Sequence, residues 1–243
     1  MSEISVMKER LSRRTLLPID PVRVALVAVS CVVLVVASII FVDRPLATWV
    51  HEHLNGGWLL PYSVNYQGRQ LPVSIFMLMA APAEALGKAA TGGLMIMGIA
   101  GIVGWRPRHW GQILLAVCIA VVVAITMKEE LKWIFGRTWP ESWLQINPSW
   151  TRDHVFNFQF FHGWLGRASF PSGHMTIVAA AAAVLWNTCP RMRFISLSVA
   201  TFVAAGLVFG NYHFLSDVIA GAYLGAAIGL VACALILRQD LEL

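Results

Sequence analysis

The sequence predicts an all-α, polytopic membrane protein, arranged as a bundle of six transmembrane helices in one domain over residues 1–243. Hydrophobic residues make up 58% of the chain, and charged residues make up 13%, against about 25% in an ordinary soluble domain. The mean hydropathy is +0.68, and several apolar segments approach the roughly 20 residues that a membrane-spanning helix needs. These values exclude a disordered chain, a coiled coil and a small disulfide scaffold.

The first span is expected at 22–42, directly after a basic N-terminal stretch. Its apolar run is longer than that of a signal peptide and lacks a small-residue cleavage site, which favours an uncleaved span. Residues 43–72 are of mixed polarity, with a short helix at the membrane interface expected over 46–54.

The second span is expected at 86–105. Residues 73–105 are apolar but interrupted by Pro82, Glu84 and Lys88, so the stretch ahead of the span is expected to lie at the interface. A short basic turn then leads into the third span. The remaining spans are expected at 111–131, 174–188, 194–212 and 215–237, with a long polar and aromatic loop over 132–173.

Positive charge predicts the orientation of the bundle. Ten of the 18 Lys and Arg residues fall on the side that holds both termini and the short turns, so this side is expected to be cytoplasmic. The loop 132–173 would then face outward, into the periplasm of a bacterium. The net charge of +5 is explained by this topology, and no nucleic-acid partner is expected. The ten residues are Lys8, Arg10, Arg13, Arg14, Arg23, Arg106, Arg108, Arg191, Arg193 and Arg238.

Three polar stretches, 132–140, 169–174 and 211–217, all fall at the outer ends of predicted spans, so we expect them to meet at one membrane face. Ser172 and Gly173 suit a helix start, where free N–H groups favour an anion. His174 adds a titratable ring beside them. The alternative is an ordinary capped helix with an interfacial histidine.

His213 and Asp217 are spaced i, i+4, which places both side chains on one helix face. A carboxylate on one ring nitrogen makes the other nitrogen a better nucleophile or base. A purely structural hydrogen bond is the alternative. Lys132 and Arg137 could clamp a phosphate or extend toward lipid headgroups. Lys128, Glu129 and Glu130 are expected to form a solvated or headgroup-contacting patch.

The stretches KWIFGRTWP, SFPSGH and NYHFLSD resemble the three motifs of the type 2 phosphatidic acid phosphatase (PAP2) superfamily, which read K-x6-R-P, P-S-G-H and S-R-x5-H-x3-D. The resemblance is strong over 128–221. It implies a PAP2-like core and a membrane-bound bacterial lipid phosphatase of the inner membrane that needs no metal or other cofactor.

The resemblance also implies a role for each motif residue. His213 would attack phosphorus and form a phospho-histidine, and Asp217 would orient its ring. His174 would protonate the leaving oxygen. Phosphate oxygens would be held by Lys132, Ser172 and Gly173.

Two family arginines are missing from their expected positions, which here hold Trp139 and Leu207. Arg137, two residues before Trp139, and Arg167, just ahead of the P-S-G-H stretch, are the candidate replacements for phosphate binding. An uncompensated loss of such charge-assisted contacts would leave a poor phosphatase.

The resulting expectation is a phosphatase for a lipid phosphate or diphosphate, acting at the periplasmic face within the bilayer. Candidate substrates are undecaprenyl diphosphate, phosphatidate, phosphatidylglycerol phosphate and a lipid A phosphate. A lipid phosphotransferase with the same histidine nucleophile and a degenerate, non-catalytic lipid-phosphate binder are the alternatives. A channel or transporter is disfavoured, because its ionisable residues would usually lie near the membrane midplane.

Overall fold

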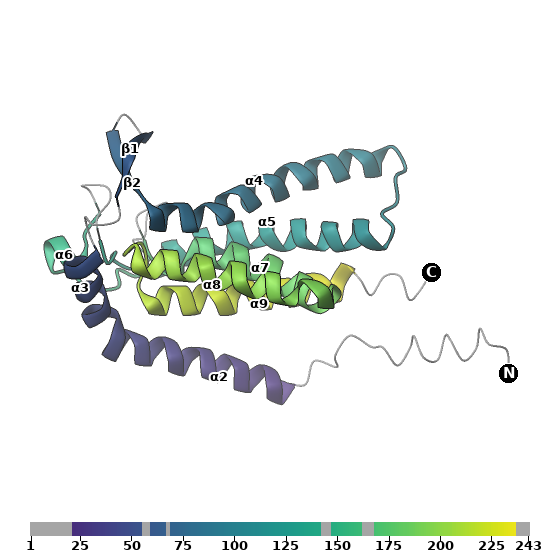
Figure 1. Ribbon diagram of the computed structural model, residues 1–243. Coiled ribbons are helices and arrows are strands. Elements are labelled where there is room, and N and C mark those ends of the chain that lie inside the picture. Colours follow the sequence, from purple (N-terminus) through teal and green to yellow (C-terminus); the bar gives the residue numbers. More distant parts are fainter. Residues whose placement is uncertain (1–20, 55–58, 67–68, 142–146, 162–167, 237–243) are drawn as a thin grey trace.

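The computed structural model describes residues 21–54, 59–66, 69–141, 147–161 and 168–236. Most of these residues form long helices that run along one direction (Figure 1). In chain order the elements are α2 (Pro21–Ala37), the π-helix η1 (Ser38–Val42), α3 (Asp43–Leu54), β1 (Leu59–Tyr66), β2 (Arg69–Ser74), α4 (Ile75–Ile102), α5 (His109–Phe135), α6 (Trp150–Asp153), α7 (Gly173–Thr188), the 3-10 helix η2 (Pro190–Met192), α8 (Arg193–Phe209) and α9 (Leu215–Ile236).

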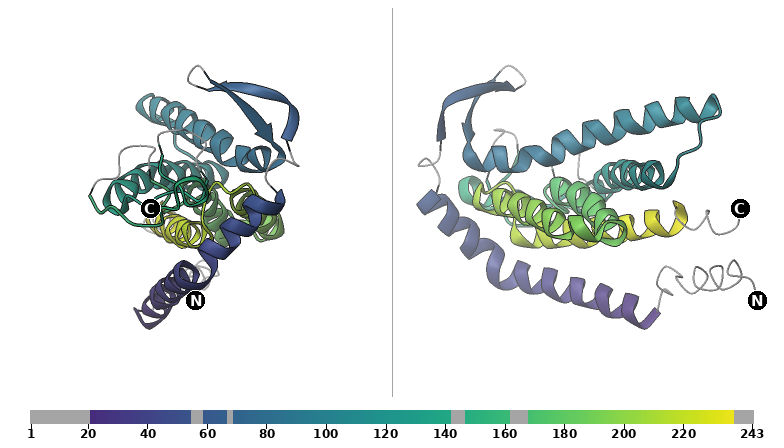
Figure 2. Two further views of the ribbon diagram at one scale, coloured as in Figure 1. Left: turned by 90° about the vertical axis from the view of Figure 1, so that its left-hand side faces the viewer. Right: turned by 45° about the vertical axis from the view of Figure 1, so that its right-hand side comes forward.

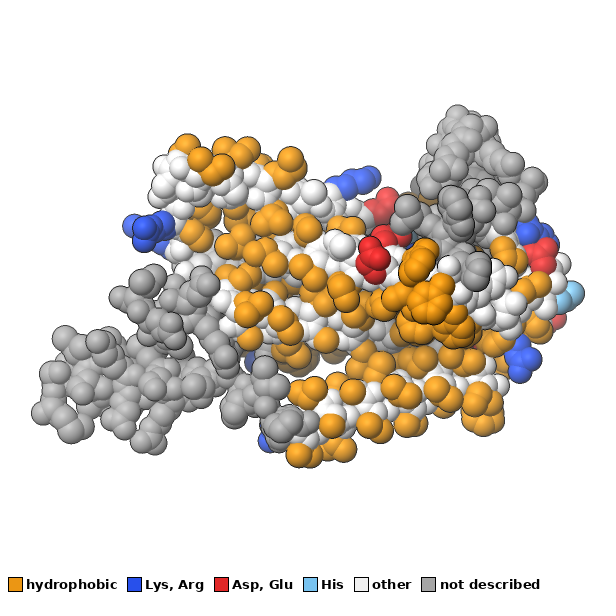
Figure 3. Space-filling view, turned by 180° about the vertical axis from the view of Figure 1, so that it is seen from behind, with side chains coloured by type: hydrophobic (Ala, Val, Ile, Leu, Met, Phe, Trp, Pro, Cys, Tyr) orange, Lys and Arg blue, Asp and Glu red, His pale blue; other side chains and the backbone are white. Residues whose placement is uncertain are grey.

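The predicted multi-pass helical bundle is confirmed. Within the described part of the chain, five helical segments are long and apolar enough to cross a membrane. The sixth long helix, α7, has 16 residues and is shorter than a typical span. Hydrophobic side chains cover most of the bundle's length, and the acidic side chains visible in Figure 3 lie in the half of the molecule that holds α3 and α6. The five segments are Val22–Leu54, Ile75–Ile102, His109–Phe135, Pro190–Phe209 and Leu215–Ile236.

The helix that covers most of the expected span 86–105 begins earlier, at Ile75, and ends at Ile102. Ser74 caps it, accepting a hydrogen bond from the backbone N–H of Met77 at 3.2 Å, and α4 runs through Pro82 without ending. Glu84 and Lys88 do not interrupt the helix, because they form an i, i+4 pair on its exposed side. Polarity alone therefore misplaced this boundary.

The region 43–72 also differs from the expectation. The first span does not end before an interfacial helix, because α2, η1 and α3 follow one another without a break. A two-stranded antiparallel hairpin, β1 and β2, then leads into α4. The hairpin stands beyond the end of the bundle, near α3 and α6 (Figures 1 and 2).

Helix α7 is the centre of the bundle and packs against α4, α5, α8 and α9. Its closest neighbour is α9, where Gly221, Gly225 and Gly229 face the α7 backbone. A Cβ atom at Gly225 would lie 2.2 Å from the carbonyl oxygen of Thr176. These small residues therefore permit an approach that brings the first residues of α7 beside those of α9.

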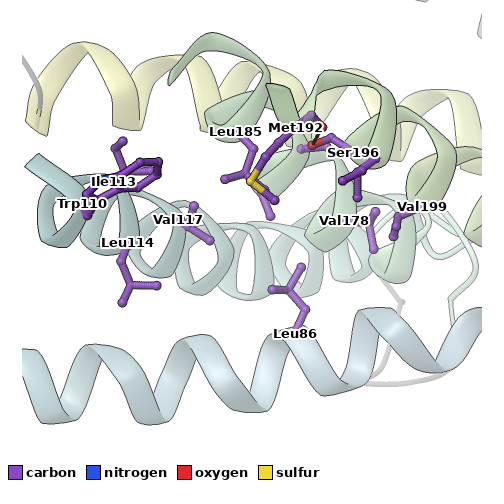
Figure 4. Close-up of a pocket in the computed structure, with 13 residues that line it drawn as sticks. Leu86, Trp110, Ile113, Leu114, Val117, Val178, Leu185, Met192, Ser196 and Val199 are labelled. Atoms are coloured by element: carbon purple, nitrogen blue, oxygen red, sulfur yellow. Dashed lines mark hydrogen bonds between the residues drawn. The ribbon is translucent and has the colours of Figure 1, made fainter. Parts of the chain in front are cut away.

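An apolar cavity of about 360 Å³ lies between α4, α5, α7 and α8 (Figure 4). It is lined by Leu86, Trp110, Val178, Met192 and further aliphatic residues, and Ser196 is the one hydroxyl in the lining. No titratable side chain lines it. The cavity is therefore a hydrocarbon environment, and the chemistry must be sought elsewhere.

Candidate active site

The candidate site lies at the end of the bundle where α5 ends and α7 and α9 begin. Helix α5 continues through Phe135, so Lys132 stands on its last turn rather than in a loop. Gly136 ends the helix with a φ of 54°, and its N–H donates to the Lys132 carbonyl oxygen at 2.9 Å. Glycine adopts this left-handed conformation without the steric cost of a Cβ.

Ser172 and Gly173 start α7 as the sequence predicts. The Ser172 hydroxyl accepts a hydrogen bond from the N–H of Met175 at 3.4 Å and so caps the helix. The Ser172 N–H donates to the carbonyl oxygen of Asp217 at 3.0 Å. This bond fixes the P-S-G-H stretch directly against the first turn of α9.

His213 and Asp217 form a buried pair. The Nδ1 atom of His213 lies 3.4 Å from a carboxylate oxygen of Asp217, and that same oxygen accepts the N–H of Phe214 at 3.1 Å. Assigning the ring proton to Nδ1, which faces the carboxylate, leaves Nε2 with a free lone pair. The side chains of His213 and Asp217 are 3% and 0% exposed.

Burial lowers the pKa of His213 to about 4. Asp217 opposes this shift, whereas the charges of Lys132 and His174 reinforce it. The ring is therefore neutral, and able to act as a nucleophile, at neutral pH. The charges of both Lys132 and His174 are thus near enough to His213 to affect its pKa.

Lys132 is 7% exposed. Its ammonium lies 5.5 Å from the centre of the Trp139 ring and makes no hydrogen bond or ion pair with any residue that the structure describes. Trp139 also packs against His213, with ring centres 5.1 Å apart. Position 139, where the motif that this stretch resembles has arginine, thus lies beside His213 and carries an indole in place of a guanidinium.

Arg137 occupies a different place from the one expected of a phosphate ligand. Its guanidinium is 1% exposed and donates to Asp217, to the hydroxyl of Ser216 at 2.6 Å and to the carboxylate of Asp43 at 2.7 Å. The ring of Phe214 lies 4.5 Å from it. Two carboxylates compensate this buried charge, so its donors are directed at protein groups.

Asp43 is a site residue that the sequence analysis missed. It lies at the start of α3 and is fully buried, and one oxygen accepts the N–H of Ser216 at 3.1 Å while the other accepts the Ser216 hydroxyl and Arg137. The available signal was its charge, because a carboxylate directly after a long apolar run is costly unless it is paired.

His174 stands on the first turn of α7 with a side chain 36% exposed, and its Nε2 lies 3.9 Å from a carboxylate oxygen of Glu84 on α4. It is thus an accessible imidazole whose charge acts on the buried ring of His213. Arg167, the other candidate replacement, lies outside the described residues. Leu207, at the second missing arginine position, is fully buried in the apolar core between α4, α7 and α8.

Comparison with known proteins gives matches to membrane phosphatases. The chain is 31% identical over 121 residues to proteins named lipid A 1-phosphatase from Rhizobium johnstonii and Rhizobium etli. The match covers 50% of this chain and 47% and 49% of the two relatives, so the chain spans about half the length of the curated relatives it matches.

A solved PAP2-type phosphatidylglycerolphosphate phosphatase from Bacillus subtilis aligns with 88% of this chain and 96% of its own, at 16% identity and a TM-score of 0.41. The model of the PAP2 superfamily matches residues 110–240, more than half of the chain. The matched region contains Lys132, Ser172, His174, His213 and Asp217. This chain therefore belongs to the PAP2 superfamily.

Proposed function

We propose that this multi-pass membrane protein is a lipid phosphatase, which hydrolyses a lipid phosphate or diphosphate through a phospho-histidine at His213. Membership of the superfamily and the names of the relatives support a phosphatase activity. The apolar bundle supports a lipid substrate, because the candidate site lies at one end of helices long enough to cross a bilayer.

One observation carries the proposal: the buried His213–Asp217 pair lies near a buried ammonium that forms no ion pair with any residue that the structure describes. Burying a charge without a partner is costly. Lys132, at the end of α5, is such a charge. A phosphoryl group bound there would compensate Lys132 and also meet the free N–H groups at the start of α7.

In the proposed reaction, Nε2 of His213 attacks phosphorus, and the bond between phosphorus and the lipid oxygen breaks. His174 donates a proton to the departing oxygen. A water molecule then attacks the phospho-histidine, returns a proton to His174 and releases inorganic phosphate with a neutral His213. Lys132 and the α7 amides stabilise the charge on the equatorial oxygens throughout.

Asp43 and Arg137 act in this scheme as positioning residues. Arg137 fixes one oxygen of Asp217, which leaves the other to face His213. Asp43 in turn fixes Arg137 and Ser216. The orientation of the nucleophile thus depends on a chain of buried charge-assisted contacts that reaches the first membrane helix.

The distribution of positive charge favours a periplasmic site with both termini cytoplasmic. The relatives' name makes a lipid A phosphate the first substrate to test, with phosphatidylglycerol phosphate, phosphatidate and undecaprenyl diphosphate as the others. A phosphotransferase would use the same phospho-histidine and differ in the acceptor that replaces water.

The test is phosphate release from this substrate panel by the purified protein in detergent, without an acceptor lipid. Wild type should release inorganic phosphate, and His213→Ala should lower turnover to background because the covalent step is lost. Glu52→Gln, an exposed change on α3, serves as the control and should behave as wild type. Turnover at the wild-type rate in His213→Ala would disprove the mechanism. Transfer of the phosphoryl group to an added acceptor lipid, without release of inorganic phosphate, would identify a phosphotransferase.

A further inference from the structure

Lys128, on α5, approaches the start of α7, and Lys132 follows it one helical turn later. They are spaced i, i+4 near the end of α5 and so share one helix face. The sequence analysis assigned Lys128 to a solvated patch, but its side chain is 17% exposed. It passes across Gly173, where an added Cβ would lie 2.6 Å from the lysine Cδ and 3.1 Å from its Nζ. The glycine of the P-S-G-H stretch therefore leaves room for this lysine.

This arrangement concentrates positive charge. The N-terminus of α7 carries the positive end of a helix dipole, and a cation there is unfavourable unless an anion joins it. Lys128 forms an ion pair with the neighbouring Glu129, whereas Lys132 makes no hydrogen bond or ion pair within the described part of the chain. Among the residues that the structure describes, Lys128 is thus paired with a carboxylate, and the neighbouring Lys132 is not.

The two motif positions that hold arginine in the family carry no guanidinium in this chain. Trp139 and Leu207 occupy the two arginine positions. Arg137 forms ion pairs with Asp43 and Asp217. Lys88, on α4, is 84% exposed and lies 4.0 Å from Glu84. Among the cations that the structure describes, Lys128 is the one whose side chain lies against Gly173, the first residue of α7.

The geometry points to Lys128 as a second phosphate-binding lysine, which supplies charge that the missing arginines would otherwise provide. This inference rests on the proposed function, because it concerns the same phosphoryl group. In the free protein Glu129 holds the ammonium in place. When a phosphoryl group binds at the start of α7, Lys128 donates to a phosphate oxygen, and the ion pair with Glu129 opens.

The experiment breaks the Lys128–Glu129 pair from each side and measures the affinity for inorganic phosphate by titration calorimetry and by inhibition of turnover. Lys128→Gln should weaken phosphate binding by about ten- to a hundredfold, the usual effect of losing a hydrogen bond to a charged group. Glu129→Gln frees the ammonium and should leave the affinity equal to that of wild type or tighter. Lys128→Arg should retain binding within a few fold.

Lys88→Gln is the matched control, because it removes a lysine from an exposed i, i+4 pair on α4, and it should bind phosphate as wild type does. Melting temperatures of all variants show whether the bundle is intact. Equal weakening by Lys128→Gln and Glu129→Gln would overturn the inference, since that result is expected of a merely structural ion pair. Unchanged binding by Lys128→Gln would overturn it as well.

Calorimetry keeps this inference separate from the proposed function. A wild-type protein that binds inorganic phosphate but releases none from any lipid phosphate would contradict the phosphatase proposal alone. In that case, a loss of phosphate affinity in Lys128→Gln together with retention in Glu129→Gln would still assign the lysine to the anion site.

Discussion

The imidazole of His213 is held neutral by its surroundings, which should determine how kcat/KM depends on pH. Its pKa is about 4 in the folded protein, against an ordinary value of 6.5. We therefore expect the acidic limb of kcat/KM to fall near pH 4 and not near pH 6.5. The profile should be measured with two substrates whose phosphates ionise differently, because the histidine limb stays in place while a substrate limb moves. An acidic limb near pH 6.5 with both substrates would contradict this assignment.

The difference between the pKa of His213 in the folded chain and in the unfolded chain also makes the free energy of unfolding depend on pH. The unfolded chain binds a proton at His213 near pH 6.5 and the folded chain only near pH 4, so protonation favours unfolding between these values. This contribution to stability is complete above about pH 6.5 and is lost progressively as the pH falls toward 4.

Replacement of Asp43 tests the positioning role of the buried network. In Asp43→Asn the guanidinium of Arg137 loses one of its two carboxylates, so Asp217 and His213 are less firmly held. We expect kcat to fall by about tenfold or more, with KM little changed, because the proposed phosphate contacts at Lys132 and α7 remain. Steady-state kinetics at several pH values is the measurement.

The pH profile of the kinetic constants distinguishes a positioning role of Asp43 from a simple loss of folded protein. Loss of folded protein would lower the active fraction without moving the acidic limb of the pH profile, whereas a misplaced Asp217 should shift that limb, since it acts on the His213 ring. Asp43→Glu keeps the charge and should recover part of kcat. A drop in kcat that only follows the loss of folded protein would argue against the positioning role.

At the residue scale, motif chemistry predicted the His213–Asp217 pair because both members lie within one helical turn. Asp43 and Arg137 could not be assigned in this way. Their roles follow from contacts with Ser216 and Asp217, which lie more than 70 positions away in the sequence. An arginine near a phosphate motif suggests phosphate binding until the carboxylates that surround it are known.

At the scale of helices, the approach of α7 to α9 sets the distance between the two histidine-bearing segments. Gly225→Ala places a methyl group 2.2 Å from the carbonyl oxygen of Thr176, so the helices must separate. Overpacking usually costs about 1–3 kcal/mol, and we expect a lower melting temperature with an accompanying loss of activity. Gly98→Ala on α4 meets no atom within 4 Å and is the control. Unchanged melting in Gly225→Ala would show that this contact can relax.

Element boundaries were predicted unevenly, for a physical reason. The apolar run 22–42 identified the first span, but nothing in it showed that the helix continues through η1 into α3. On α4, Glu84 and Lys88 suggested an interfacial stretch, although their i, i+4 spacing lets a helix carry both on one exposed side. The polarity of a segment indicates whether it lies in an apolar or a polar environment. It does not show where a helix ends, because a helix can carry polar residues on a face that is not packed.

At the scale of the whole molecule, the sequence predicted that three separate polar stretches meet at one end of the bundle. The structure places them in direct contact, through the Ser172–Asp217 backbone bond and the Arg137–Asp217 ion pair. This prediction follows from the order of the spans, because successive membrane helices start and end at opposite faces. The order of the spans does not predict the apolar cavity among α4, α5, α7 and α8, which depends on side-chain shape.

The first helical segment carries Asp43, and this changes what a minimal version of the protein must contain. Residues 110–240 include every motif of the superfamily, so trimming the chain to that stretch would keep both histidines and the lysines on α5. It would also remove Asp43, one of the two carboxylates that pair with the buried guanidinium of Arg137, and leave the pair with Asp217. In the proposed mechanism, the helical segment Val22–Leu54 therefore supplies a positioning residue and does more than hold the protein in the membrane.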